Sequence, residues 1–133
     1  MKNIFLSMTL TTLLASFNVF SSDDCRSAND DADVNSCSLQ QKKNAEVELN
    51  KEYSEAKKRL AVSFDADKKL LNEYLTLLLE SQRSWLKYRD TQCKIESFMA
   101  DESTPVYESI NDSCIAGLDK DRTAQLKKNM PYE

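Results

Sequence analysis

The sequence predicts an all-α fold, a small antiparallel three-helix domain stabilised by two disulfides. The 133-residue chain has one glycine and two prolines, and none of them falls between Ser38 and Met99, so helix breakers are absent from this stretch. Apolar residues recur at steps of three and four along three stretches, which is the period of an amphipathic helix. The chain also has four cysteines, and covalent cross-links compensate for the modest core of a domain of this size.

Residues 1–22 have the layout of a secretory signal peptide. A lysine near the start precedes a long uncharged run that ends in small residues. The apolar part is short against the ~20 residues of a membrane-spanning helix. The residues just before Cys25 are acidic rather than apolar, so a lipid on this cysteine is not expected. We therefore predict one periplasmic or secreted domain over 23–133, with no stable membrane insertion after cleavage.

All four cysteines lie in the predicted mature chain, and an even number in an exported protein indicates two disulfides. Three pairings are possible. Proximity along the chain favours Cys25–Cys37 and Cys93–Cys114. A zinc site is the alternative, but the spacings contain no C-x-x-C motif and the chain has no histidine. We predict the two disulfides and no metal.

Charge and composition exclude several classes of function. The formal net charge is −4, and loss of Lys2 with the signal peptide leaves 17 basic and 22 acidic residues, a net charge of −5. This acidity argues against nucleic acid and anionic membranes as partners, and leaves a cationic protein open. Without histidine, and with a single glycine, the chain offers no hydrolytic triad and no phosphate loop. We predict neither a cofactor nor an enzymatic activity.

The first helix is predicted from near Ser38, as its N-cap, to about Val62. The segment before it, NDDADVN (29–35), is predicted to be an acidic loop. A calcium loop is the alternative, but the glycine and glutamate that such a loop needs are missing. An acidic loop constrained by a disulfide is preorganised to enter a cationic cleft. The candidate partner-binding residues are therefore Asp30, Asp31 and Asp33.

The second and third helices have clear start signals. The second begins near Asp65 or Asp67 and runs through Cys93, and because residues 71–80 are apolar on more than one side, we expect it to be the central helix. The third begins with an N-cap threonine followed by Pro105 at the first helical position. Gly117 weakens this helix by ~1 kcal/mol relative to alanine. Lysines in its last turn and a proline beyond mark its end.

The stretch ESQRSWLKYRDTQC (80–93) holds the only tryptophan. On a helix, Gln82, Trp85, Arg89 and Cys93 share one face, which continues the apolar stripe of the preceding turns. An inward arginine needs a carboxylate or backbone carbonyls as partners, because an unpaired buried charge costs several kcal/mol. We predict a structural polar network around Trp85, with a ligand-contacting face as the alternative.

Three motifs, LNKEY (49–53), QRSWLKYRDTQC (82–93) and a late cysteine followed by DRTAQL (121–126), together resemble the N-terminal domain named for the lysozyme inhibitor LprI. The resemblance spans Cys25 to about Leu126, although residues 99–113 differ from the glycine-rich segment of many relatives. It implies a small exported helical protein that binds and inhibits lysozyme. Its motifs extend the predicted structural polar network to Asn50, Tyr53, Gln82, Trp85, Arg89, Asp90 and Arg122.

The leading hypothesis is an exported binding protein that inhibits lysozyme, with an acidic surface engaging this or another cationic protein. The alternative is an envelope structural protein or a toxin-immunity protein that binds another protein partner. An enzyme is the third hypothesis, and it would require a pocket with perturbed carboxylates.

Overall fold

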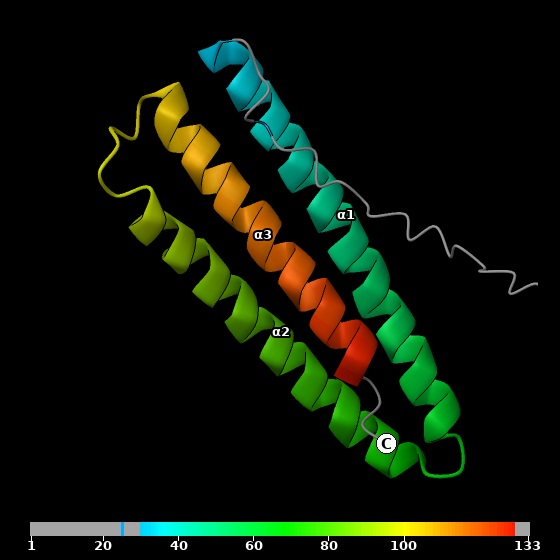
Figure 1. Ribbon diagram of the computed structural model, residues 1–133. Helices are drawn as coiled ribbons and strands as arrows, with labels where there is room; N and C mark the ends of the chain where they lie inside the picture. Colours follow the sequence, from blue (N-terminus) through cyan, green and yellow to red (C-terminus); the bar gives the residue numbers. More distant parts are fainter. Residues whose placement is uncertain (1–24, 26–29, 130–133) are drawn as a thin grey trace, which may run out of the picture.

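The computed structural model describes residue 25 and residues 30–129 (Figure 1). This part of the chain forms three helices and no strand: α1 (Asp31–Ser63), α2 (Lys68–Glu96) and α3 (Pro105–Asn129). The predicted all-α, three-helix fold is confirmed. The predicted signal peptide, residues 1–22, and the helix-stopping Pro131 lie outside the described residues. None of the three described helices combines the length and the apolar character needed to cross a membrane.

α3 lies between α1 and α2, and α2 runs opposite to both (Figure 1). The expectation that α2 would be the central helix is therefore wrong. α3 is able to bury a broad arc because apolar, small and internally paired polar residues alternate on it: Asp112, Ile115, Ala116, Asp119, Arg122, Thr123 and Leu126. On α2, two of the leucines that made it look central, Leu70 and Leu77, are exposed.

Side-chain caps set the helix starts. α1 begins at Asp31 rather than near Ser38, because the Asp30 carboxylate accepts a hydrogen bond from the backbone N of Asp33 at 2.8 Å. The predicted acidic loop is thus largely the first turns of a helix. The predicted cap of α2 is confirmed, since Asp67 accepts a hydrogen bond from the backbone N of Leu70 at 2.9 Å.

The start of α3 also follows the prediction. The Thr104 hydroxyl accepts a hydrogen bond from the backbone N of Tyr107 at 3.3 Å, and Pro105 is the first helical residue. The helix continues without interruption through Gly117. Thr104 and Pro105 therefore start α3 as their local chemistry predicts. The cost of Gly117 is outweighed by the burial of the helix that contains it.

The apolar core lies toward the end where α1 turns into α2. Its fully packed members come from all three helices: Leu49, Leu60, Leu71, Leu78 and Leu126. Five partly buried side chains pack against them: Tyr53, Phe64, Tyr74, Leu75 and Trp85. We call this half of the molecule the hairpin end.

Both predicted disulfides are confirmed. Cys93–Cys114 joins the last turns of α2 to α3 with a Cα–Cα distance of 5.5 Å. Cys25–Cys37 ties the segment before α1 onto that helix, with a Cα–Cα distance of 5.8 Å. Both bridges lie in the half of the molecule away from the apolar core.

Candidate functional site

The stretch that holds Trp85 forms the contact between α2 and α3. Gln82 and Cys93 are buried, and Trp85 and Arg89 are partly buried on the same face of α2. Opposite them α3 contributes Asp119 and Arg122, both buried. We call Gln82, Trp85, Arg89, Asp119 and Arg122 the arginine seam.

Arg89 binds carboxylates from all three helices. Its Nη1 donates to Asp119 Oδ1 at 2.9 Å, and its Nε and Nη2 donate to Asp90 Oδ1 at 2.8 and 2.7 Å. Glu46 of α1 lies 3.7 Å from the same Nη1. The side chain of Arg89 is 11% exposed and that of Asp119 is not exposed at all, so this is a desolvated pair that holds α2 against α3.

Burial and pairing oppose each other in the pKa values of this pair. Burial favours the neutral form of Arg89, but the hydrogen bonds that Arg89 donates to Asp119 and Asp90 outweigh it and raise the pKa of Arg89. Burial raises the pKa of Asp119, and repulsion from Glu46 and Asp90 adds to this, while Arg89 offsets part of the shift. Arg89 is therefore the partner that opposes the rise in the pKa of Asp119.

Arg122 is held by amide and hydroxyl groups. Its Nε donates to Gln82 Oε1 at 3.1 Å, its Nη2 to Ser81 Oγ at 3.1 Å and its Nη1 to Gln125 Oε1 at 2.6 Å. The guanidinium carbons of Arg89 and Arg122 lie 5.8 and 5.7 Å from the centroid of the Trp85 ring, within the range of cation–π attraction. The lone tryptophan thus contacts both arginines.

The structure brings together five of the seven residues of the predicted network and places two elsewhere. Their contacts form one chain, which runs from Gln82 through Arg122, Trp85 and Arg89 to Asp90. Asn50 is exposed on α1, and Tyr53 packs on the apolar core with Lys57 Nζ 4.9 Å from its ring centroid.

Sequence reasoning missed the main partner of Arg89. A signal was present, because Ile115, Asp119, Arg122 and Leu126 recur at steps of four, three and four, and an aspartate in such a stripe points inward. In the described part of the chain every buried side-chain nitrogen or oxygen has a hydrogen-bond partner. The arginine seam therefore satisfies its own polar groups and presents none of them unpaired to a ligand.

The three predicted contact residues, Asp30, Asp31 and Asp33, are exposed at the start of α1. The start of α3 lies beside them, since Asn35 Nδ2 donates to Glu108 Oε2 at 3.2 Å. The helical path of this segment also separates residues two apart onto different sides. Asp31, Asp33 and Asn35 therefore do not converge as ligands of a calcium loop would.

Carboxylates gather at this end of the molecule. Residues 30–36 and 96–113 contain neither lysine nor arginine. We call their eight carboxylates the acidic end: Asp30, Asp31, Asp33, Glu96, Asp101, Glu102, Glu108 and Asp112. Asp112 is buried and paired internally with Lys42 Nζ at 2.8 Å, and the other seven are exposed. Hydrogen bonds from the Ser103 hydroxyl and backbone N lower the pKa of Asp101.

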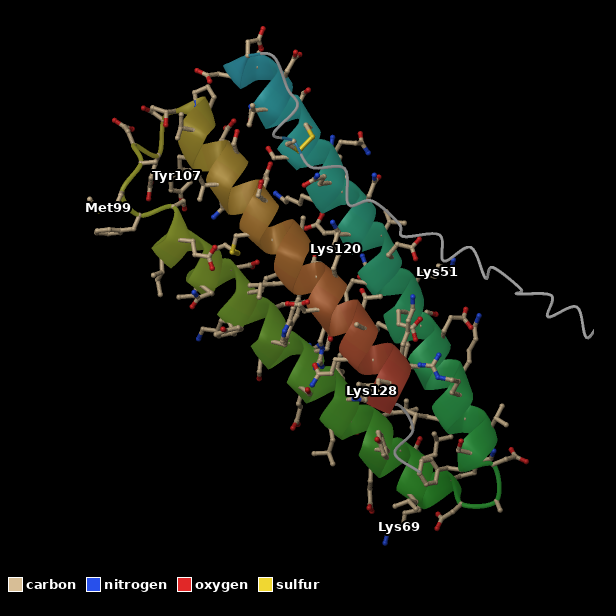
Figure 2. All side chains as sticks on the ribbon, viewed as in Figure 1. Lys51, Lys69, Met99, Tyr107, Lys120 and Lys128 are labelled. Atoms are coloured by element: carbon tan, nitrogen blue, oxygen red, sulfur yellow. A yellow bond between two sulfur atoms is a disulfide. The ribbon has the colours of Figure 1, made fainter. Side chains whose placement is uncertain are left out.

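Many of the described basic residues lie toward the opposite end, whereas Lys42, which pairs with Asp112, and Lys94 lie near the acidic end. Figure 2 shows Met99 and Tyr107 at one end of the molecule, and Lys69 and Lys128 at the other. Further lysines of this second end are Lys57, Lys58, Lys68 and Lys127. The molecule is therefore electrically polar along its length, with its negative pole at the acidic end.

Exposed apolar side chains accompany the acidic end, and the sequence analysis did not single them out. Phe98 and Met99, in the turn after α2, are 79% and 94% exposed. A hollow of about 190 Å³ lies between the starts of α1 and α3, lined by Asp31, Val34, Pro105, Val106, Ser109 and Ile110. Small-molecule sites usually have ~300–1,000 Å³, so this hollow suits a single side chain of a protein partner better.

Residues 22–126 match the family model described as "Lysozyme inhibitor LprI". The chain belongs to the LprI family. The match includes the whole arginine seam, both disulfides and the acidic end. The resemblance read from the three sequence motifs is thereby confirmed.

Relatives of the LprI family agree with this assignment. The chain is 36% identical over 115 residues to an uncharacterized protein of Rhizobium meliloti (strain 1021), an alignment that covers 80% of this chain and 78% of the relative. It is 34% identical over 126 residues to the uncharacterized protein YecT of Escherichia coli (strain K12), with coverage of 88% and 78%. A crystal structure of a DUF1311 family protein from Pseudomonas putida KT2440 has the same fold, with a TM-score of 0.68 at 24% identity over 75% of this chain and 93% of the other.

In the described part of this LprI-family chain, no group of three or more Cys, Asp or Glu side chains is arranged to hold a metal ion. What the described residues do offer is an electrically negative end with apolar side chains at its tip, mounted on a cross-linked helical scaffold. Such a surface can bind a protein by charge attraction and side-chain insertion.

Proposed function

We propose that the protein is an exported inhibitor of lysozyme, and that its acidic end binds the cationic enzyme. The observation that carries the proposal is the grouping of seven exposed carboxylates, with no basic residue in the same two segments, in a chain of the LprI family. Inhibition is by occupation of the enzyme, and no chemistry by this chain is involved.

The negative charge of the acidic end should speed its association with a cationic partner. A patch of one sign attracts a partner of the opposite sign and raises the association rate, more strongly at low ionic strength. The lysines and arginines of the opposite end are remote from the contact. Asp30, Asp31 and Asp33, at the start of α1, are the proposed contact residues, and Glu108 of α3 lies beside this segment.

Preorganisation supports tight binding. Cys93–Cys114 cross-links α2 to α3, and Cys25–Cys37 ties the segment before α1 onto that helix, so less conformational entropy is lost when a partner binds. Phe98 and Met99 supply exposed apolar area beside the charges. Aromatic and methionine side chains of this kind are enriched at the centres of protein interfaces.

Export fits this role. The signal peptide proposed for residues 1–22 would direct the mature chain to the periplasm or the medium, where disulfides form and persist. Lysozyme acts on the cell wall from the same side. The proposed inhibitor and its target would therefore meet in one compartment.

The test is a lysis assay with purified mature protein. Wild-type protein in molar excess should slow lysozyme lysis of cell walls, and added salt should weaken the effect. The triple variant Asp30→Asn, Asp31→Asn, Asp33→Asn should need about tenfold more protein for half-inhibition. Asparagine keeps the N-cap of α1, so loss of the helix does not confound the result.

A matched control removes three exposed carboxylates outside the acidic end: Glu48→Gln, Asp65→Asn and Asp121→Asn. This variant has the same net charge as the first and should inhibit like wild type. Equal lysis rates with and without excess wild-type protein would overturn the proposal. A pull-down from periplasm would then test the alternative of an envelope or immunity protein, with the acidic-end triple variant as the bait that should lose its partner.

A further inference from the structure

A row of exposed apolar side chains runs along α2 beside the face that contacts α3. Leu70, Leu77, Tyr88 and Ile95 are 44%, 66%, 56% and 64% exposed. Their offsets from Leu70 are seven, eighteen and twenty-five residues, each close to a whole number of turns at 3.6 residues per turn. They therefore lie on one line along the helix. With the two exposed serines on that line, we call the row the outer stripe: Leu70, Leu77, Ser81, Ser84, Tyr88 and Ile95.

The outer stripe is symmetric along the helix. Each member has a counterpart at the same distance on the other side of the point midway between Gln82 and Arg83: Leu70 with Ile95, Leu77 with Tyr88, and Ser81 with Ser84. Two copies of α2 in antiparallel contact would therefore place large apolar side chains opposite large ones and serine opposite serine. This is the property that a two-fold symmetric interface requires.

A column of charges borders the outer stripe on the side away from α3. Glu73, Glu80, Lys87 and Lys94 are exposed and follow one another at intervals of seven residues, so they form one line beside the apolar row. Their order is two negative charges and then two positive ones. The column has its own centre between Arg83 and Ser84, one residue from that of the outer stripe, so in an antiparallel pair Glu73 lies near Lys94 of the second copy and Glu80 near Lys87. In a parallel two-fold pair the two columns would lie on opposite edges of the contact and would not pair with each other.

We propose that the protein forms a two-fold dimer in which the outer stripes of two antiparallel α2 helices pack together. The occupant of this face is a second copy, because the apolar spacing and the charge order are both self-complementary. An unrelated helix would have to match both. Flanking charges of this kind select partner and orientation in paired helices.

The dimer is independent of the proposed inhibition and compatible with it. The acidic end includes Glu96 and the turn that follows α2. Since the two α2 helices run in opposite directions, the two acidic ends lie at opposite ends of the dimer. Each remains free to bind a partner, which would make the dimer bivalent.

Charge reversal on the bordering column is the decisive experiment, with mass measured by sedimentation equilibrium at sub-millimolar concentration. Wild-type protein should have twice the monomer mass. The variant Glu73→Lys, Glu80→Lys has four positive charges in the column, and Lys87→Glu, Lys94→Glu has four negative ones, so each alone should be monomeric. An equimolar mixture of the two should recover the doubled mass.

Two controls separate pairing from folding and from net charge. The exchange variant Glu73→Lys, Lys94→Glu keeps opposite charges facing in the antiparallel pair and should remain a dimer, although it reverses charges in the same column. The variant Glu48→Lys, Glu102→Lys changes the net charge as Glu73→Lys, Glu80→Lys does, but outside the column, and should also remain a dimer. Circular dichroism should show every variant helical. A monomeric wild type, or a doubled mass for either single-sign column alone, overturns the proposal.

Discussion

The two ends of this domain are held together by different means. At the hairpin end, leucines from three helices pack into an apolar core beside Phe64 and Tyr74. At the acidic end, the helices are joined by the Cys93–Cys114 bridge, the Lys42–Asp112 ion pair and the Asn35–Glu108 hydrogen bond. The hairpin end is stabilised by burial of apolar area, and the acidic end by covalent and polar links.

The difference explains how a small domain presents a charged surface. An apolar core at the acidic end would take up the helix faces that now carry carboxylates and would bury Phe98 and Met99 of the turn after α2. A disulfide needs only two side chains to fix two helices. Cross-links therefore leave most of that surface available for a partner, and the arginine seam connects the two ends.

Replacing Arg89 of the arginine seam should have the largest effect on stability. In Arg89→Met, the carboxylate of Asp119 stays buried without its cation, and we expect the free energy of unfolding to fall by about 3–5 kcal/mol. Urea unfolding measured by circular dichroism would show this. Arg83→Met, an exposed arginine on the same helix, is the control and should change stability by less than about 0.5 kcal/mol.

The loss in Arg89→Met should also depend on pH. Burial raises the pKa of Asp119, and the hydrogen bond from Arg89 opposes that shift. Without Arg89 the folded-state pKa rises further above the unfolded value, so the folded variant binds a proton more readily than its unfolded chain. The stability gap to wild type should therefore narrow as the pH falls from neutral toward about 4. A gap that widens on acidification would contradict this account.

Truncating a leucine of the apolar core should cause the next largest loss of stability, and this loss should affect the hairpin end. Leu60 is fully buried, and Leu60→Ala removes packed methyl groups and leaves a cavity, at a cost of about 2–5 kcal/mol. Val62→Ala, two residues on and 78% exposed, should cost far less. If both variants unfold at the same urea concentration, the apolar core is not what stabilises this end.

Local chemistry made much of the fold predictable. Steps of three and four residues located the helices, Asp67 and Thr104 marked two starts, and proximity along the chain gave the disulfide pairing. The start of α1 was missed because the run around Asp31 was taken as a loop, although Asp30 is a strong N-cap residue. Signals confined to one turn of helix were thus present in the sequence for all three helix starts, and only that of Asp30 was misinterpreted.

Contacts between residues that are far apart in the sequence could not be predicted in the same way. Apolar residues on two sides of α2 indicated a central helix, but periodicity defines a face without saying what covers it. Leu77 remains exposed, and α3 is central instead. Likewise the need of Arg89 for a carboxylate was clear, while Asp119, thirty residues away, was identified only by the packing of α3.

Removing the Cys93–Cys114 disulfide should lower the stability of the acidic end more than that of the hairpin end. In Cys93→Ala, Cys114→Ala, the loss of a bridge over 21 residues should lower stability by about 3 kcal/mol. Hydrogen exchange should locate the effect, with amides of Ser97 and Tyr107 losing more protection than that of Leu78. Uniform loss of protection along all three helices would mean that the two ends unfold as one unit and that the contrast between them is structural only.

The smallest expected effect is a gain in stability at Gly117. This glycine is exposed in the middle of α3, its backbone is helical, and beyond its chain neighbours and the backbone of its own helix no atom lies within 4 Å of where a Cβ would be. Gly117→Ala should therefore raise the free energy of unfolding by about 0.5–1 kcal/mol, because alanine loses less backbone entropy in a helix. Ala124→Gly, exposed on the same helix nearer the hairpin end, is the reverse control and should lower it by a similar amount. If Gly117→Ala destabilises the protein while Ala124→Gly behaves as expected, backbone entropy is not what decides stability at position 117.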